Sequence, residues 1–386
     1  MELVNTTWQD VYETIPIRDN LLRFLPYERE EILFYSPELQ KEPLDFAALL
    51  SRKLPGQKIV IACDNTYGLK LLAGNRISST DDYFFSMEEN FHPQTGSLTY
   101  SKAQLEEMLA AEGISEYTFF YPYPNYQLPL AVYSDDYLPH IGELTNNERN
   151  FGVDRLVLFQ ETLAWNQILR DHQFTVFSNS YLLVIGDTPS TEYGRLLFTK
   201  FSNDRNSQYN IRTDILDAGR RFVTKSAMDE EAREHILRQQ DIYETLQKNY
   251  HESEFEFCPV TVSDNTAVYS YLEGEVLDEV LAKLYQKKDL ELLYQMTDQF
   301  IRAVYKTSNP EFIDVDLIFK NIILSEDRWK VIDYEWTFDV AELSFADKFD
   351  LKFVIYRSLY YFYVDHHIDE QTITHMYHMA DILEAD

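Results

Sequence analysis

Glycine and cysteine are scarce in this sequence: its 386 residues include 11 glycines and 2 cysteines. No two glycines lie within five residues of one another, so every G-x-G turn of the kind that lets backbone approach a bound nucleotide is absent. Cys63 and Cys258 stand far apart and lack metal-type spacing, which predicts buried free thiols in a reducing compartment.

Basic residues are also few, with 34 Lys and Arg against 65 Asp and Glu and a formal net charge of −31. Such an acidic surface repels phosphate backbones and anionic lipid, which argues against general nucleic-acid or membrane-surface binding. A nucleotide that brings its own magnesium is not excluded. The sequence shows neither a signal-peptide pattern nor the roughly 20 apolar residues of a membrane span, so we expect a cytoplasmic protein.

Apolar residues, by contrast, are plentiful, at 45% of the chain with 15% aromatics. The length exceeds what one core organises, which predicts two domains. The segment DTPSTEYG (187–194) has linker composition, so we expect domains at 1–188 and 189–386.

The first half has an alternating α/β pattern. It predicts helices at 44–53, 101–113 and 153–170 and buried strands at 58–65 and 177–186. Ser101 and Gly113 are suited to cap the second of these helices. The proline-rich stretch 117–139 predicts an edge strand and an ordered loop.

The second half predicts two strands within 195–215, a third at 220–225, an acidic helix at 228–247 and a strand at 266–275. A helix at 277–306, broken near Lys287 and Lys288, follows. This is the order in which the N-lobe of a kinase leads into its C-lobe. It therefore predicts an α+β, bilobal, protein-kinase-like domain.

The stretch FIDVDLIFKNIILSEDRWKVIDYEW (312–336) carries the most chemical information. Asp316 and Asn321 have the D-x-x-x-x-N spacing of a kinase catalytic loop, and Asp333 follows a predicted hairpin. A hairpin with Asn at its entrance and Asp at its exit places two hard oxygen ligands side by side, as Mg²⁺ requires. Asp316 is then the predicted general base. The alternative, that these are solvated turn residues, is opposed by their apolar flanks.

Other positions would complete a nucleotide site. Lys225 ends its strand where a kinase lysine grips the phosphates, and Glu231 on the next helix is the predicted partner. The alternative is a surface lysine beside a solvated acidic helix. Leu272 and Glu273, in YLEGE (271–275), lie where the hinge segment of a kinase would offer backbone groups to adenine. The alternative is an ordinary turn. The turn 202–209 has no glycine, which indicates either a different phosphate grip, through Arg205 or the side chains of Ser202 and Ser207, or a degenerate site.

At these residues the chain resembles the kinase module of bacterial bifunctional methyltransferase–kinases, which cap surface polysaccharides such as O-antigen chains. The resemblance is carried by FSNDRNSQYNIRT, the VTK strand and DLIFKN…VIDYEW, and it extends from about residue 45 to 365. It implies ATP and Mg²⁺ as cofactors and a sugar hydroxyl of a glycan, or of its lipid-linked precursor, as acceptor. Separately, we expect a membrane-associated glycosyltransferase as partner, through which the protein would reach the inner face of the membrane.

The first half resembles the distal part of the methyltransferase module in that family. The half that should bind S-adenosylmethionine is missing, so we expect a truncated Rossmann-like remnant without methyltransferase activity. Asp64, Asn65 and Tyr67 match a family motif near the methyl-transfer site and are expected to be structural or acceptor-binding. Two functions remain open: a glycan kinase, or a non-catalytic scaffold that binds glycan or a glycosyltransferase.

Overall fold

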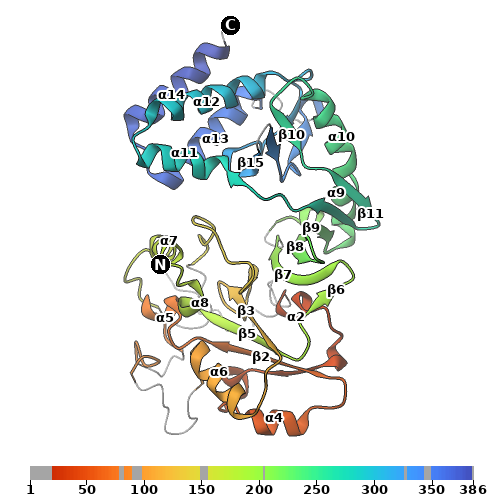
Figure 1. Ribbon diagram of the computed structural model, residues 1–386, viewed down its shortest axis with the longest axis vertical. Helices are drawn as coiled ribbons and strands as arrows, with labels where there is room; N and C mark the ends of the chain where they lie inside the picture. Colours follow the sequence, from red (N-terminus) through yellow and green to blue (C-terminus); the bar gives the residue numbers. More distant parts are fainter. Residues whose placement is uncertain are drawn as a thin grey trace, which may run out of the picture. The chain divides into compact units, whose positions relative to one another are not determined.

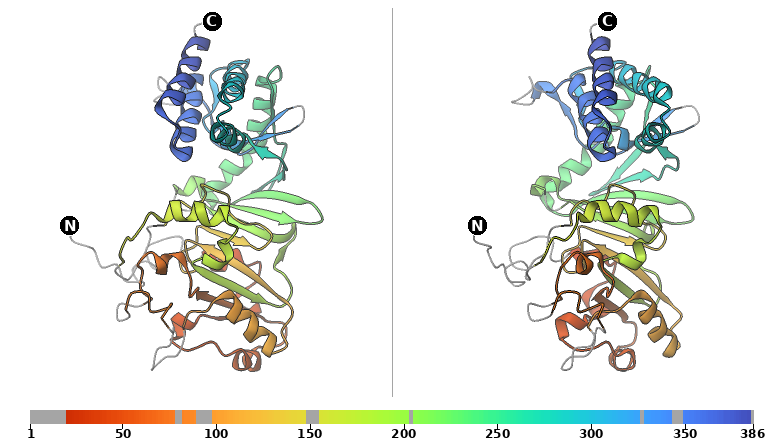
Figure 2. Two further views of the ribbon diagram at one scale, coloured as in Figure 1. Left: turned by 60° about the vertical axis from the view of Figure 1, so that its left-hand side comes forward. Right: turned by 90° about the vertical axis from the view of Figure 1, so that its left-hand side faces the viewer.

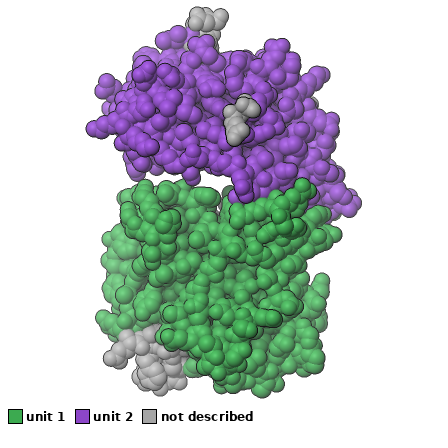
Figure 3. Space-filling view, viewed as in Figure 1, with its two compact units in different colours: residues 1–232 green, residues 233–386 purple. Residues whose placement is uncertain are grey.

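The protein is a mixed α/β chain in two units, residues 1–232 and 233–386 (Figures 1 and 3). The computed structural model describes residues 20–77, 82–88, 98–147, 155–202, 205–325, 328–342 and 349–384. None of the helices in these ranges is long and apolar enough to cross a membrane. Cys63 and Cys258 are both buried free thiols, as predicted.

The first unit is built on a large mixed sheet whose strands run in the order β1-β2-β5-β3-β4-β7-β8-β9, with β6 paired to β7. The strands are β1 (Ile32–Tyr35), β2 (Lys58–Asp64), β3 (Tyr117–Tyr123), β4 (Ala131–Ser134), β5 (Ser180–Ile185), β6 (Ser190–Thr191), β7 (Gly194–Phe201), β8 (Ile211–Asp217) and β9 (Arg221–Ala227). The α-helices are α2 (Asn20–Phe24), α3 (Pro37–Gln40), α4 (Phe46–Arg52), α5 (Leu69–Leu72), α6 (Lys102–Ala111), α7 (Glu161–Arg170) and α8 (Phe174–Phe177).

Among the described strands of this unit, β1 and β2 pair parallel, whereas β2 and β5 and the strand pairs that follow are antiparallel. Apolar side chains of β2, β3 and β5 fill its core, among them Val60, Phe120 and Leu182, each fully buried. Each such side chain contributes about 1.5–3 kcal/mol when it leaves water. Helix α6 begins at a capping box of Ser101 with Gln104, and Gly113 follows it at φ 70°, as predicted.

Three predictions for this unit differ from the structure. Residues 155–160 are not helical, because the N–H of Leu156 bonds to the carbonyl of Gly74 and holds the chain extended; helix α7 starts only at Glu161. Strand β3 lies between β5 and β4 and not at an edge. The units divide at Ala232/Arg233 and not at 188/189. Strand β7 pairs with β4, and β8 and β9 extend the same sheet, so the residues that follow 188 belong to the first unit.

The second unit combines a four-stranded sheet, β10-β16-β15-β13, with a two-stranded pair, β14-β17, and with helices of which the last four pack on one another (Figure 2). Its strands are β10 (Phe255–Phe257), β11 (Val260–Ser263), β12 (Thr266–Ser270), β13 (Glu275–Val276), β14 (Phe312–Asp314), β15 (Ile322–Leu324), β16 (Trp329–Val331) and β17 (Thr337–Asp339). Its helices are α9 (Arg233–Leu237), α10 (Gln239–Asn249), α11 (Leu277–Gln286), α12 (Leu290–Tyr305), α13 (Leu351–His366) and α14 (Glu370–Glu384).

Aromatic side chains join the sheet of this unit to its helices. Phe300 of α12 contacts Phe319, with ring centroids 4.7 Å apart, and also Phe255 of β10. All three side chains are almost completely buried. The predicted break between α11 and α12 is present, with Lys288 in left-handed backbone at φ 61°. This packing holds the segment 314–321 against the helices.

Candidate functional site

The loop that contains Asp316 is fixed by its own backbone and by helix α13. It leaves β14 at Asp314, whose Oδ1 accepts a 3.0 Å hydrogen bond from the N–H of Asp316. The carbonyl oxygen of Asp316 in turn accepts bonds from the N–H of Ile318 and from Nδ2 of Asn321, at 2.7 and 2.9 Å. The N–H of Phe319 donates to Oγ of Ser358 on α13 at 3.0 Å. Asp316 is therefore held from both sides of the loop.

The predicted hairpin follows this loop. Strands β15 and β16 pair antiparallel with Ile322 opposite Val331, and the N–H of Ile332 donates to the carbonyl of Asn321 at 2.8 Å. Asp333 is the next residue, so it emerges beside Asn321 at the open end of the hairpin. Its backbone is left-handed, at φ 58°, and it is exposed. Non-glycine residues held in this region cluster at functional sites.

Charge is concentrated around Asp316. Burial raises the pKa of its carboxyl above the usual value, and Asp333 and Glu335 raise it further, while a hydrogen bond from Arg357 opposes the shift. That bond runs from Nη2 of Arg357 to Oδ1 of Asp316 at 2.7 Å. Arg357 lies 41 positions downstream, on α13. No local sequence pattern links Arg357 to Asp316, so this contact is not among the predictions from the sequence.

The donor set at the hairpin suits a hard divalent cation. The amide of Asn321 is oriented by its Nδ2 bond to Asp316, and within the described ranges its Oδ1 accepts no hydrogen bond. With the Asp333 carboxylate this offers two oxygen ligands. The described residues include no cluster of three or more His, Cys, Asp or Glu side chains able to hold a metal. A pair of protein oxygens fits Mg²⁺, which usually takes its remaining ligands from phosphates and water.

The residues predicted to hold phosphates belong to the first unit. Lys225 lies in β9 opposite Thr213 and is buried, whereas Arg205 is half-buried and Ser202 is buried. Residues 203–204 of the predicted phosphate turn are outside the described residues. The roles assigned to these side chains remain predictions.

Glu231 does not lie on a helix as the partner of Lys225, which was the prediction from the sequence. It lies in a 3₁₀ turn, η4 (Glu230–Ala232), and not on the following helix, and it is exposed. Among the described residues there is no ion pair between Glu231 and Lys225. This turn lies between the end of β9 at Ala227 and the start of α9 at Arg233.

The predicted hinge connects β12 to β13 in the second unit. Leu272 is half-buried and Glu273 exposed, and Gly274 follows at φ +152°. A Cβ at Gly274 would lie 2.7 Å from the carbonyl oxygen of Leu324 in β15. The glycine therefore allows this segment to run directly against β15, the strand that follows Asn321.

Asp64, Asn65 and Tyr67 are at the end of β2. Nδ2 of Asn65 donates to the carbonyls of Val176 and Ser178, both at 2.7 Å, and its Oδ1 accepts from the N–H of Tyr67. Both oxygens of Asp64 accept from Nζ of Lys70 at 2.7 Å. These contacts support the structural interpretation of Asp64 and Asn65.

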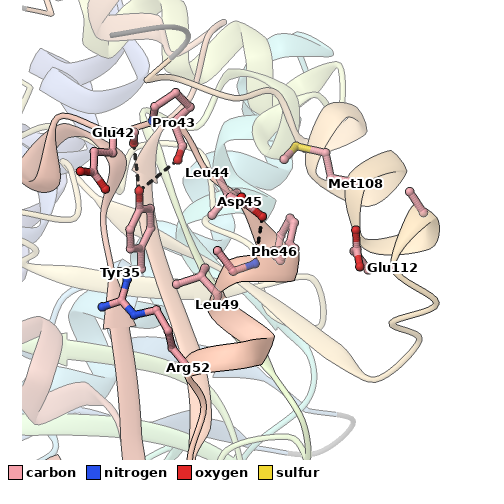
Figure 4. Close-up of a pocket in the computed structure, with 12 residues that line it drawn as sticks. Tyr35, Glu42, Pro43, Leu44, Asp45, Phe46, Leu49, Arg52, Met108 and Glu112 are labelled. Carbon is pink, nitrogen blue, oxygen red and sulfur yellow. Dashed lines mark hydrogen bonds between the residues drawn. The ribbon is translucent and has the colours of Figure 1, made fainter.

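A cavity of about 640 Å³ lies elsewhere in the first unit (Figure 4). Its lining comes from the end of β1, the segment before α4, and helices α4 and α6, and includes Tyr35, Leu44, Phe46, Leu49, Arg52 and Met108. The hydroxyl of Tyr35 donates to the carbonyls of Glu42 and Pro43, each at 3.0 Å. None of the lining residues belongs to the Asp316 loop or to the hairpin.

Comparison with known proteins adds no family assignment. No protein-family model matches the sequence, and no curated protein matches it.

Proposed function

We propose that this chain is an ATP-dependent phosphotransferase that acts on a sugar hydroxyl of a bacterial cell-surface polysaccharide or its lipid-linked precursor. The observation that carries the proposal is the arrangement of Asp316, Asn321 and Asp333. Nδ2 of Asn321 donates a hydrogen bond to the carbonyl oxygen of Asp316, and the N–H of Ile332 donates to the carbonyl oxygen of Asn321, which brings the next residue, Asp333, beside Asn321. The sugar acceptor comes from the family resemblance. The proposal includes a cytoplasmic location and a glycosyltransferase that presents the acceptor.

Each of the three residues has a distinct task. Asp316 orients the acceptor hydroxyl and takes its proton as the acceptor oxygen forms a bond to the γ-phosphorus of ATP. The bond from that phosphorus to the β–γ bridging oxygen breaks, which gives ADP and a phosphorylated sugar. Asn321 and Asp333 would hold Mg²⁺, which neutralises phosphate charge when bound. A well-placed general base contributes roughly 10²–10⁴-fold in rate.

The test has a binding part and a turnover part. ATP with Mg²⁺ should stabilise the full chain against heat, because a ligand at 100 times its Kd adds about 2.7 kcal/mol. Asp316→Asn should keep this stabilisation and abolish transfer of labelled phosphate from ATP to surface glycan. In cells that lack the protein, mass spectrometry should find a phosphate missing from that glycan. A chain that millimolar ATP and Mg²⁺ do not stabilise would support the non-catalytic scaffold.

A further inference from the structure

Among the residues that the structure describes, Arg357 is the cation that ties helix α13 directly to the side chain of Asp316. We propose that Arg357 is a positioning residue, which holds the Asp316 carboxylate in the orientation that its role as base requires. This inference rests on the proposed function. It adds a residue from α13 to a site otherwise built from the loop and the hairpin.

The geometry of the contact leaves half of the carboxylate available. Arg357 donates through Nη2 to Oδ1 only, at 2.7 Å. Within the described part of the chain, Oδ2 of Asp316 accepts no hydrogen bond. An arginine can grip a carboxylate through two parallel bonds, which would occupy both oxygens. The single bond instead fixes the rotation of the carboxylate and leaves Oδ2 for the acceptor hydroxyl.

The guanidinium is itself held in place. Its central carbon lies 4.9 Å from the ring centroid of Tyr361, one helical turn further along α13. Ser358, the neighbour of Arg357, accepts the bond from Phe319 of the loop. Helix α13 therefore fixes the loop backbone and the Asp316 side chain from adjacent positions.

The arrangement is not what stability alone would favour. The Nε–H of Arg357 is buried and has no hydrogen-bond partner among the described residues. A buried donor without a partner lowers stability, and a catalytic role is one of the reasons for which native structures retain such groups. A monodentate contact that leaves Nε unused fits a residue whose task is to orient Asp316.

The experiment follows ATP hydrolysis by the full chain with Mg²⁺, with water as acceptor and ADP release as readout. Arg357→Gln should lower kcat about tenfold or more while KM for ATP stays within about twofold, because misplacing a catalytic group costs up to about 10²-fold. Arg357→Lys should recover part of the loss. In an Asp316→Asn background, Arg357→Gln should cause no further loss, because the arginine acts through that carboxylate.

Arg302→Gln is the matched control, since Arg302 pairs with Asp298 on the exposed face of α12. It should leave kcat unchanged. An unchanged kcat in Arg357→Gln, or a further loss in the double variant, would overturn the inference while leaving the proposed function standing. Absence of both ATP binding and hydrolysis in the unaltered chain would overturn the proposed function, and the inference with it. Thermal midpoints of all variants separate loss of folding from loss of turnover.

Discussion

Asp333 lies beside Asn321, because the residue that precedes Asp333, Ile332, donates its N–H to the carbonyl oxygen of Asn321 at 2.8 Å. The hairpin register thereby converts a separation of twelve residues in sequence into adjacency in space. Two oxygen ligands at neighbouring positions of a rigid hairpin need little rearrangement to bind a cation, which lowers the entropic cost of binding.

Replacing Asp333 by Asn should therefore weaken binding of ATP with Mg²⁺. The substitution keeps the shape of the side chain but removes the charge that a hard cation prefers. We expect affinity to fall tenfold or more, which reduces the stabilisation at a fixed ligand concentration by about 1.4 kcal/mol. Thermal unfolding with and without ATP and Mg²⁺ measures this. Asp298→Asn, on the exposed face of α12, is the control; equal stabilisation of both variants would contradict the prediction.

Local patterns in the sequence predict the parts of the site that depend on nearby residues. The D-x-x-x-x-N spacing and the hairpin lie within 18 residues, from Asp316 to Asp333, and an apolar run, a polar turn and a second short strand are enough to predict the hairpin. The contact of Arg357 with Asp316 depends on how α13 packs against the loop. Tertiary packing of this kind leaves no signal in the local sequence.

The differences in the fold have the same origin. Prolines in 117–139 predict an edge strand, yet β3 lies inside the sheet. Its pairing with β5 ends at Phe120 and only β4 pairs with Pro122, so the proline falls where the strand has one neighbour. Likewise the helical pattern before Glu161 is overridden by the bond between Leu156 and Gly74.

Gly274→Ala should destabilise the sheet that carries the candidate site. The added Cβ would lie 2.7 Å from both the Leu324 carbonyl oxygen and Cγ2 of Ile323, at a φ of +152°. Forced overpacking of this kind typically costs about 1–3 kcal/mol. Hydrogen exchange of peptides that cover 322–324 should become faster. Gly219→Ala also places an alanine at a positive φ, +84°, but nothing lies within 4 Å of its new Cβ. The difference in destabilisation between the two variants therefore measures the effect of the clash.

Lys70→Met should destabilise the first unit strongly. Lys70 and Asp64 form a buried pair, with side chains 9% and 8% exposed. Removing the lysine leaves the Asp64 carboxylate buried without its cation, which typically costs about 3–5 kcal/mol. Faster hydrogen exchange in β2 is the expected readout. The exposed pair of Lys283 with Glu275 provides the comparison, because water screens both charges and Lys283→Met should have a much smaller effect. Equal effects of the two substitutions would contradict the prediction.

The stability of the first unit should fall as pH rises from about 5 to about 8, because of Glu38. Burial, followed by the neighbouring Asp64 charge, raises the pKa of Glu38 to about 8, although the N–H of Asp64 and the charge of Lys70 oppose the shift. A carboxyl whose pKa is higher in the folded state binds its proton more tightly there. Its stabilising contribution is therefore complete below the unfolded pKa of about 4.3 and is lost as pH rises through the folded pKa.

Glu38→Gln should remove this dependence while preserving the local contacts. The amide oxygen can still accept the 2.7 Å bond from Asp64, and the hydroxyls of Ser36 and Tyr126, which now contact the other carboxylate oxygen, can accept from the new amide group. Hydrogen exchange of β2 measured at pH 5 and pH 8, corrected for the intrinsic exchange rate, tests this. Glu42→Gln, at an exposed position, should retain the full pH dependence. If stability falls equally with pH in both variants, Glu38 is not the group responsible.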